Sequence, residues 1–212
     1  MKRTTWLGIA AALVLAGGGG MTLALADGHD GGAPPSATAT PSTDSADAGF
    51  ARDMAVHHQQ AVEMSFVVRD RTDDEDIRRL AYDIANTQAN QRGMLLGWLT
   101  LWGLPISSGD EPMGWMDMPA SLSPGHDGAL MPGMATNSEI KKLGELDGKE
   151  AEIFYLQLMT DHHKGGVHMA EGCVERCAVG VEKRLAQGMV DAQKSELDLM
   201  AALLKERGAK PR

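Results

Sequence analysis

The chain has 212 residues, with 20 Lys and Arg against 29 Asp and Glu, and a formal net charge of −9 at neutral pH. An acidic chain of this kind repels nucleic acid and attracts cations, so we expect no nucleic-acid partner. Once its N-terminal segments are set aside, the length suits one ordinary domain.

Residues 1–26 have the pattern of a secretory signal peptide. Lys2 and Arg3 precede an apolar stretch, and Ala24-Leu25-Ala26 forms an A-x-A-like cleavage site. The alternative is an uncleaved membrane anchor, but four consecutive glycines make a poor spanning helix. We therefore expect cleavage after Ala26 and a mature chain outside the cytoplasm. Its net charge would be −11, because the removed segment carries two positive charges and no negative ones.

Residues 27–48 are rich in Gly, Pro, Ala, Ser, Thr and Asp. Such a composition cannot bury a core, so this segment is predicted to be a disordered linker. The folded domain is then expected to span residues 49–212. No later segment is apolar enough to cross a membrane, so we expect no stable membrane span after cleavage.

The chain repeats itself at a fixed offset of 105 residues. Met54, His57-His58 and Met64 align with Met159, His162-His163 and Met169, and other matches at the same offset extend over about 50 residues. Each half therefore forms one structural unit that is used twice.

Each unit is predicted to contain two helices, because apolar residues recur with a period near 3.6. In the first unit a helix from about residue 50 to 65 is followed by a polar break, where Asp73 or Asp74 could cap the next helix. That second helix ends at Gly103 and Pro105. The second unit repeats the pair over residues 153–171 and 181–207. Two amphipathic hairpins predict an all-α fold, a four-helix bundle.

Residues 103–138 are predicted to form a long Met-rich loop between the units. Loops of this length are usually functional or disordered, and thioethers contribute little to a solvated loop. We expect this loop to be flexible and to bind metal more weakly than the helices. Its candidate ligands are Met113, Met116, Met118, His126, Met131 and Met134.

The two cysteines, Cys173 and Cys177, are four residues apart near the end of the third predicted helix. In an oxidising compartment they are expected to form a local disulfide. The alternative is a thiolate metal site, for which a single Cys pair is a weak signal.

The repeated Met and His residues fall on one helical arc that faces the bundle interior. Methionine at this spacing is ordinarily core filling, and the alternative for the histidines is a buried polar network. Two adjacent pairs of buried imidazoles need partners, however, and a metal ion supplies them. Gln88 and Gln193 are placed to orient the imidazoles. The candidate ligands are Met54, His57, His58, Met64, Met159, His162, His163 and Met169.

Thioether and imidazole ligands favour copper, Cu(I) ahead of Cu(II), whereas a hard cation would need several carboxylates. Neither His pair has a Glu three residues before it, as a ferritin-like di-iron site would. Glu63 and His168 lie on the opposite helix face, so they are not expected to be ligands. Hydrolase and phosphate-loop motifs are absent from the sequence.

The doubled M-x-x-H-H pattern and the segment Met131-Pro-Gly-Met134 resemble the bacterial "domain of unknown function 305" family over about residues 49–207. The resemblance implies a ferritin-like helical bundle that is typically exported, with some members that bind copper in the periplasm. One difference between the two copies matters: Gly165-Gly166 in the second copy replace Gln60-Ala61 of the first. Two glycines in the middle of a helix reduce its stability. Such glycines would allow a close approach of another helix or a local opening.

We therefore predict a non-catalytic, extracytoplasmic copper-binding protein for buffering, resistance or delivery. Its expected partners are a metal ion and another copper-handling protein. The alternatives are a metal-dependent oxidoreductase and a structural or partner-binding bundle with a buried His network.

Overall fold

The structure, a computed structural model, describes residues 40–116 and 127–212. The predicted signal peptide, most of the predicted linker, and the candidate ligands Met118 and His126 lie outside these residues. The all-α prediction is confirmed, since the described ranges form helices and no strand. The helices are α1 (Ala46–Arg69), α2 (Glu75–Leu101), η1 (Gly114–Met116), α3 (Asn137–Glu145), α4 (Gly148–Arg176) and α5 (Gly180–Glu206).

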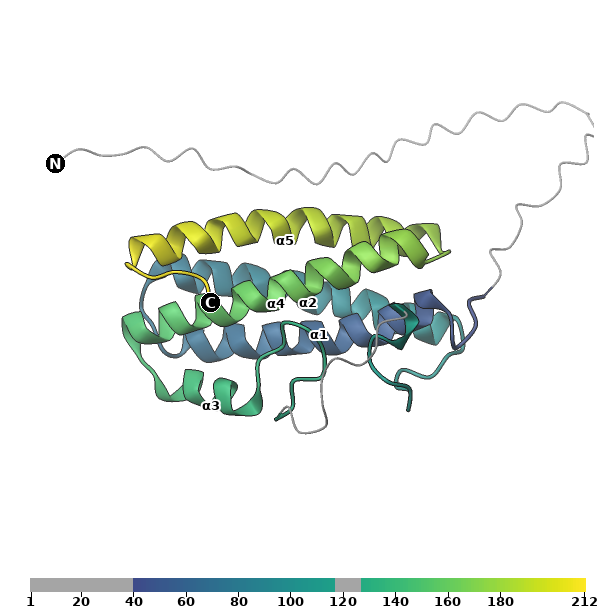
Figure 1. The fold of residues 1–212 in the computed structure, drawn as a ribbon, viewed down its shortest axis with the longest axis horizontal. Helices are drawn as coiled ribbons and strands as arrows, with labels where there is room; N and C mark the ends of the chain where they lie inside the picture. Colours follow the sequence, from purple (N-terminus) through teal and green to yellow (C-terminus); the bar gives the residue numbers. More distant parts are fainter. Residues whose placement is uncertain (1–39, 117–126) are drawn as a thin grey trace, which may run out of the picture. The chain divides into compact units, whose positions relative to one another are not determined.

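The four long helices form a bundle of two hairpins. α1 packs against α2, α4 packs against α5, and the hairpins meet where α1 contacts α4. In Figure 1, α1 and α4 run in opposite directions through the middle of the domain, with α5 along its upper edge and α3 at its lower edge. The duplicated unit of the sequence is therefore a helical hairpin. No helix within the two described ranges is both long and apolar enough to cross a membrane.

The helix ends follow their capping residues. The side chain of Ser45 accepts a hydrogen bond from the backbone N–H of Ala48 and starts α1, three residues before the predicted domain start. Of the two predicted N-cap candidates, Asp73 and Asp74, it is Asp74 whose side chain caps α2. α4 begins at Gly148 rather than near residue 153, so the third helix is longer than its apolar pattern indicated.

Helix α3 was not predicted, although its start signal is present in the sequence. Thr136 and Glu139 form a capping box, in which each side chain accepts from the backbone N–H of the other. The helix follows the end of the predicted loop directly and packs against α1 and α4. Its short length and single buried residue, Leu143, explain why it lacks a clear apolar period.

The core divides into two clusters of buried residues. The first contains Met54 and Met169, and the second contains Met64 and Met159. All four side chains are fully buried. Because α1 and α4 are antiparallel, each cluster takes one methionine from each copy of the repeated motif.

The described part of the predicted Met-rich loop places its methionines against the helices. Met113, Met116 and Met131 are buried in the first core cluster. Asp53 of α1 accepts hydrogen bonds from the backbone N–H of Met113 (2.8 Å) and the indole N–H of Trp115 (2.9 Å). The methionines fill irregular gaps against the helices, a use to which their flexible thioethers are suited.

The structure contains a disulfide between Cys173 and Cys177. Cys177 is the C-cap of α4 and has an extended backbone, so the chain has already left the helix there. This brings the two Cα atoms to 4.8 Å, closer than the about 6 Å expected for two residues four apart within a helix.

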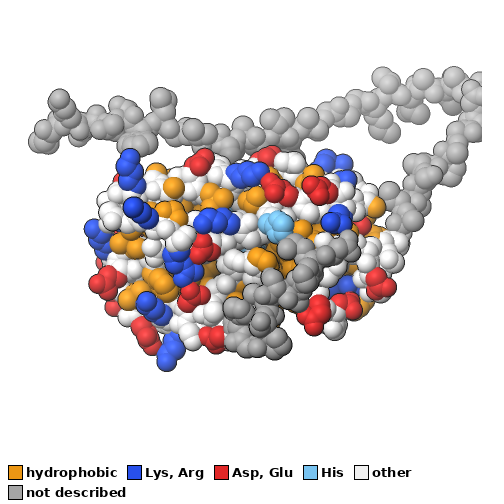
Figure 2. All heavy atoms as spheres, viewed as in Figure 1, with side chains coloured by type: hydrophobic (Ala, Val, Ile, Leu, Met, Phe, Trp, Pro, Cys, Tyr) orange, Lys and Arg blue, Asp and Glu red, His pale blue; other side chains and the backbone are white. Residues whose placement is uncertain are grey.

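The viewed surface carries charges of both signs. Figure 2 shows Lys and Arg interspersed with Asp and Glu over this face of the domain. The long helices therefore present mixed polar surfaces to the solvent and keep their apolar faces for the bundle interior.

Candidate metal centre

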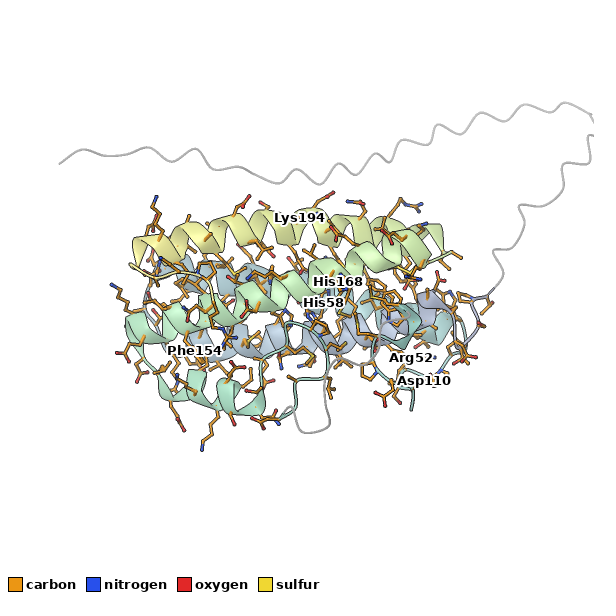
Figure 3. All side chains as sticks on the ribbon, in the orientation of Figure 1. Arg52, His58, Asp110, Phe154, His168 and Lys194 are labelled. Carbon is orange, nitrogen blue, oxygen red and sulfur yellow. A yellow bond between two sulfur atoms is a disulfide. The ribbon has the colours of Figure 1, made fainter. Side chains whose placement is uncertain are left out.

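Four histidines meet where α1 contacts α4, and none has any exposed surface. The rings of His57 and His162 lie against each other, with centroids 3.7 Å apart and planes inclined by 32°. His58 and His163 flank this pair. Figure 3 labels His58 in the middle of the domain.

The four imidazoles are arranged with approximate two-fold symmetry. The ring centroids of His57 and His58 are 6.4 Å apart at 53°, and those of His162 and His163 are 6.3 Å apart at 54°. His57 and His162 are equivalent in the repeat and face each other directly, so the pseudo-axis passes between them. The two Met-containing core clusters lie on either side of this layer, each with one methionine from α1 and one from α4.

Hydrogen bonds fix the tautomers of the second-copy histidines. His162 donates from Nε2 to the carbonyl oxygen of His57 at 2.9 Å, and His163 donates from Nε2 to the carboxylate of Glu196 at 2.7 Å. Carbonyl and carboxylate oxygens only accept, so both rings carry their proton on Nε2. The Nδ1 atom of each ring has no partner and presents a lone pair.

The first-copy histidines are still less satisfied, because neither ring nitrogen of His57 or His58 makes a hydrogen bond of good geometry. The backbone of Pro132 lies near His57, and the amides of Gln91 and Gln88 lie near His58, but only at the margin of hydrogen-bonding contact. Burial, followed by the effect of neighbouring His58 and His163, lowers the pKa of His57 to about 3. Burial also lowers the pKa of His58 to about 3, with Gln91 and Gln88 beside it opposing the change. The rings are therefore neutral at pH 7, and neutral imidazole is the form that binds metals.

Unpartnered nitrogen atoms in a closed core cost free energy unless something satisfies them. A cation near the pseudo-axis would do so through lone pairs that are already deprotonated. The donor set therefore fits a metal ion, and the flanking thioethers make it a soft set.

The two predicted orienting glutamines lie in the core beside this site. Gln88 is 2% exposed and Gln193 is 3% exposed, and the side-chain amide of each lacks a hydrogen-bond partner. Gln88 lies beside His58. Gln193 packs against Gly166, where a Cβ atom would overlap its side-chain oxygen.

The sequence analysis did not identify Glu196, which hydrogen-bonds to His163, or Gln91, which lies next to His58. The two residues are related by the same 105-residue offset as the histidines. Following that offset along the second helix of each unit would have found both. The two copies differ at this position, because His163 lies next to a carboxylate and its equivalent, His58, lies next to an amide.

The turn at residues 131–134 packs over α4 beside the histidines. Gly133 has a φ of +81° and touches the backbone of Asp161 and Gly165, while a Cβ at Gly165 would overlap the carbonyl oxygen of Pro132. The backbone of Pro132 also lies beside His57. Gly165 therefore allows the close approach of a loop, whereas Gly166 makes room for the Gln193 side chain of helix α5.

The first copy holds the same turn with Gln60 in place of a glycine. The Gln60 side chain donates to the carbonyl of Ala135 at 2.8 Å and accepts from its N–H at 2.7 Å. This pair of bonds fixes the end of the turn to α1. Met131 is 2% exposed, and Met134 packs against the same core cluster.

The residues predicted to lie outside the site do so. Glu63 of α1 and His168 of α4 are exposed, on the outer faces of their helices. The loop residues Met113, Met116 and Met131 lie in the first core cluster with Met54 and Met169. These three loop methionines are therefore buried on one side of the histidine layer, and Met134 is only partly buried against the same cluster.

The fold and the sequence have known relatives. The model of the family described as "Domain of unknown function (DUF305)" matches residues 47–204. The crystal structure of a candidate secreted DUF305 protein from Streptomyces coelicolor shares 70% identity with a TM-score of 0.75, covering 81% of this chain and 99% of that one. A DUF305 fragment from Deinococcus radiodurans shares 28% identity with a TM-score of 0.63, covering 76% and 96%.

A further solved structure with a similar fold is that of CopM in its Cu(I)-bound form. It shares 17% identity with a TM-score of 0.58, covering 76% of this chain and 96% of its own. At this identity the likeness shows the fold alone. A search among curated proteins found no match.

Proposed function

This chain belongs to the DUF305 family, and we propose that it is a copper-binding protein that buffers or delivers the metal outside the cytoplasm. The ion would be held between α1 and α4 by imidazole nitrogens, with thioethers on either side. The proposed ligands are His57, His58, His162, His163, Met54, Met64, Met159 and Met169.

One observation carries the proposal: six imidazole nitrogen atoms in a closed core have no hydrogen-bond partner, both on His57, both on His58 and one each on His162 and His163. A buried polar network, the alternative interpretation, would satisfy these atoms by pairing them with one another or with the nearby glutamines. The amides of Gln88 and Gln193 are unpartnered as well. A cation would satisfy the imidazole nitrogen atoms through their lone pairs.

Copper is favoured by the softness of the ligands. Imidazole suits several transition metals, but fully buried thioethers beside it favour Cu(I). CopM has been solved in Cu(I)-bound and Cu(II)-bound forms, which supports copper for a chain of the same fold. The four rings have no exposed surface, so an ion is a better occupant than an organic substrate, and we propose binding without catalysis.

The location rests on two observations of different kinds. The first 26 residues have the pattern of a signal peptide. The Streptomyces coelicolor relative, described as a candidate secreted protein, is 70% identical. Both favour an extracytoplasmic site of action, where another copper-handling protein would supply or receive the ion.

The loop methionines would contribute to the same site rather than form a separate, mobile one. Met131 and Met113 are buried with Met54 and Met169. Their thioethers would therefore be available at the same place as those of the helices. We propose that the 131–134 turn lies on the path by which the ion enters, because it covers Gly165 and lies beside His57.

The test is a copper titration of the mature protein, with Cu(I) under reducing conditions and Cu(II) under oxidising conditions. The variant with His58→Leu and His163→Leu keeps the core apolar and is expected to lose at least 100-fold in affinity for Cu(I), since it loses two ligands. Circular dichroism and a thermal melt would establish that it folds.

A matched control replaces Met189 and Met200, two fully buried methionines of α5 that are not among the proposed ligands, by Leu, which preserves volume and leaves the histidines intact. It is expected to change the affinity much less. Failure of the wild-type protein to bind copper, or equal affinity in the two-histidine variant, would overturn the proposal.

A further inference from the structure

A second group of metal-ligating side chains lies at the junction of α4 and α5. Cys173 is in the last turn of α4, Cys177 is its C-cap, and Glu182 is in the first turn of α5. The two sulfur atoms and one carboxylate oxygen all lie within 4.8 Å of one another. The three residues are 0%, 3% and 0% exposed, and none belongs to the histidine site.

The carboxyl group of Glu182 has the Asp47 side chain as its polar neighbour, but neither of its oxygens meets hydrogen-bond geometry in the described parts of the chain. Burial, then the like charge of Asp47 and the hydrogen-bonding contact with it, raise the pKa of Glu182 to about 9. A buried carboxyl with these surroundings is costly.

Asp47, by contrast, has a clear structural task. Its carboxylate accepts hydrogen bonds from the backbone N–H of Ala178 (3.0 Å) and Val179 (2.7 Å). Val179 is the N-cap of α5 and has no side-chain cap of its own, so Asp47 of α1 caps α5 from another helix. Glu182 is therefore not needed to satisfy the start of α5, and its burial beside two sulfur atoms requires another explanation.

We propose that reduction of the Cys173–Cys177 disulfide turns this group into a second metal site, for a borderline divalent cation such as Zn²⁺. A dithiol reductant would transfer two electrons, break the S–S bond and become a disulfide itself, leaving two protein thiols. Binding of the ion would then release three protons, one from each thiol and one from Glu182, and form two metal–sulfur bonds and one metal–oxygen bond.

The spacing suits this chemistry. Zinc bonds to thiolate at about 2.3 Å and to carboxylate at about 2.0–2.2 Å, so its ligand atoms lie about 3.4–3.8 Å apart. The three atoms here are already grouped within 4.8 Å, so the two bonded sulfurs must separate and the carboxylate must approach them by no more than about 1 Å to reach this spacing. The ion would also offset the repulsion between Glu182 and Asp47, while Asp47 keeps its hydrogen bonds to α5.

The ligand set distinguishes this site from the proposed copper site. Two thiolates with a carboxylate suit Zn²⁺, whereas imidazole with thioethers suits Cu(I). The proposal does not depend on the histidines, and it makes the redox state of one disulfide the condition for binding.

The experiment compares the oxidised protein with protein reduced by a dithiol, which is then removed without air. Both are titrated with Co²⁺, a spectroscopic substitute for Zn²⁺ that gives a thiolate-to-cobalt charge-transfer absorption. The reduced chain is expected to give this absorption with one equivalent of Co²⁺, and Zn²⁺ is expected to displace it. The oxidised chain is expected to give none. Imidazole and thioether ligands produce no thiolate band, so the histidine site does not interfere.

Three variants sharpen the result. Glu182→Gln keeps the shape of the side chain and is expected to weaken Zn²⁺ binding at least tenfold, and Cys177→Ser is expected to abolish the absorption. Glu175→Gln, an exposed neighbour on α4, is the matched control and is expected to bind as wild type does. Absence of the band in the reduced wild-type protein, or wild-type affinity in Glu182→Gln, would overturn the proposal.

Discussion

At the scale of single residues, the main feature of the molecule is that its four core histidines are fully buried and incompletely hydrogen-bonded. Burial is the leading cause of the lowered pKa of His57, His58 and His162. Neutral imidazoles repel no incoming cation and need not lose a proton to bind one. The same lack of charge makes the metal-free protein sensitive to acid.

The free energy of unfolding of the metal-free protein is expected to fall as the pH is lowered from 7 to 4. The pKa of His57 and of His58 is about 3 in the folded state, against about 6.5 when unfolded. Between these two pKa values the imidazoles of the unfolded chain bind protons and those of the folded chain do not. The free energy of unfolding that is present above pH 6.5 is therefore lost progressively as the pH falls toward 3. Each ring contributes at most about 1.4 kcal/mol per pH unit.

Urea unfolding at pH 7, 6, 5 and 4 would measure this loss. A variant with His58→Leu removes one titrating ring and is expected to show a shallower decline. Identical declines in the variant and the wild-type protein would show that the buried imidazoles are not its source.

Glu196 is expected to strengthen metal binding through His163. Its carboxylate accepts from Nε2 at 2.7 Å, which directs Nδ1 toward the site and makes the ring a better electron donor. Glu196→Gln keeps an acceptor but removes the charge, so we expect about a tenfold loss of Cu(I) affinity. In Glu196→Leu the acceptor is lost as well.

Nitrogen NMR of the metal-free protein supplies an independent measurement, because it distinguishes the two imidazole tautomers. His163 is expected to remain protonated on Nε2 in Glu196→Gln and to become a mixture in Glu196→Leu. Gln91→Glu, the equivalent change in the first copy, is expected to raise the affinity. Unchanged affinity in all three variants would argue against this role.

At the scale of elements, the long helices were predictable and the segment between them was not. The period of the apolar residues located α1, α2 and α5 closely, because these helices bury one continuous stripe. The burial of Met113 depends on hydrogen bonds to Asp53, 60 residues away, and no local pattern encodes such a contact. The position of the 131–134 turn depends similarly on Gln60 and Gly165.

Gly165→Ala is expected to destabilise the protein although alanine is the better helix former. The new Cβ would overlap the carbonyl oxygen of Pro132, and a backbone atom cannot move aside as a flexible side chain can. We expect a loss of about 1–3 kcal/mol, typical of overpacking, together with faster exchange of metal because the turn is displaced.

Gly188→Ala in α5 is the matched control, since a Cβ there meets nothing within 4 Å. It is expected to stabilise the protein by about 0.8–1 kcal/mol, the difference in helix propensity. Chemical denaturation of both variants would decide the matter, and equal stabilisation would mean that the turn does not pack on α4 as described.

At the scale of the whole molecule, the two hairpins meet along α1 and α4, and the candidate metal site lies at that contact. The repeat offset predicted the convergence of His57 and His162, because equivalent residues of two related units approach each other at a symmetry axis. It could not predict the tautomers or the unpartnered atoms. Those depend on carbonyl and carboxylate groups whose positions come only from the packed helices.

Copper is expected to raise the melting temperature of the entire domain in a single transition. Ligands from both hairpins would hold the ion, and the unfolded chain cannot reproduce that arrangement. At free copper 100 times the dissociation constant, the added stability is about 2.7 kcal/mol. Differential scanning calorimetry measures it, and a copper-dependent shift of only one of two separate transitions would contradict a site shared between the hairpins.

The pseudo-axis between His57 and His162 also bears on how this protein could have arisen. A single hairpin with the same motif would possess half a site, and two identical copies would complete it only by dimerising. In such a dimer of identical chains, the residues next to His58 and next to its equivalent would have to be the same. When the two halves are joined in one polypeptide, each position can change independently, and the equivalent positions now hold Gln91 and Glu196.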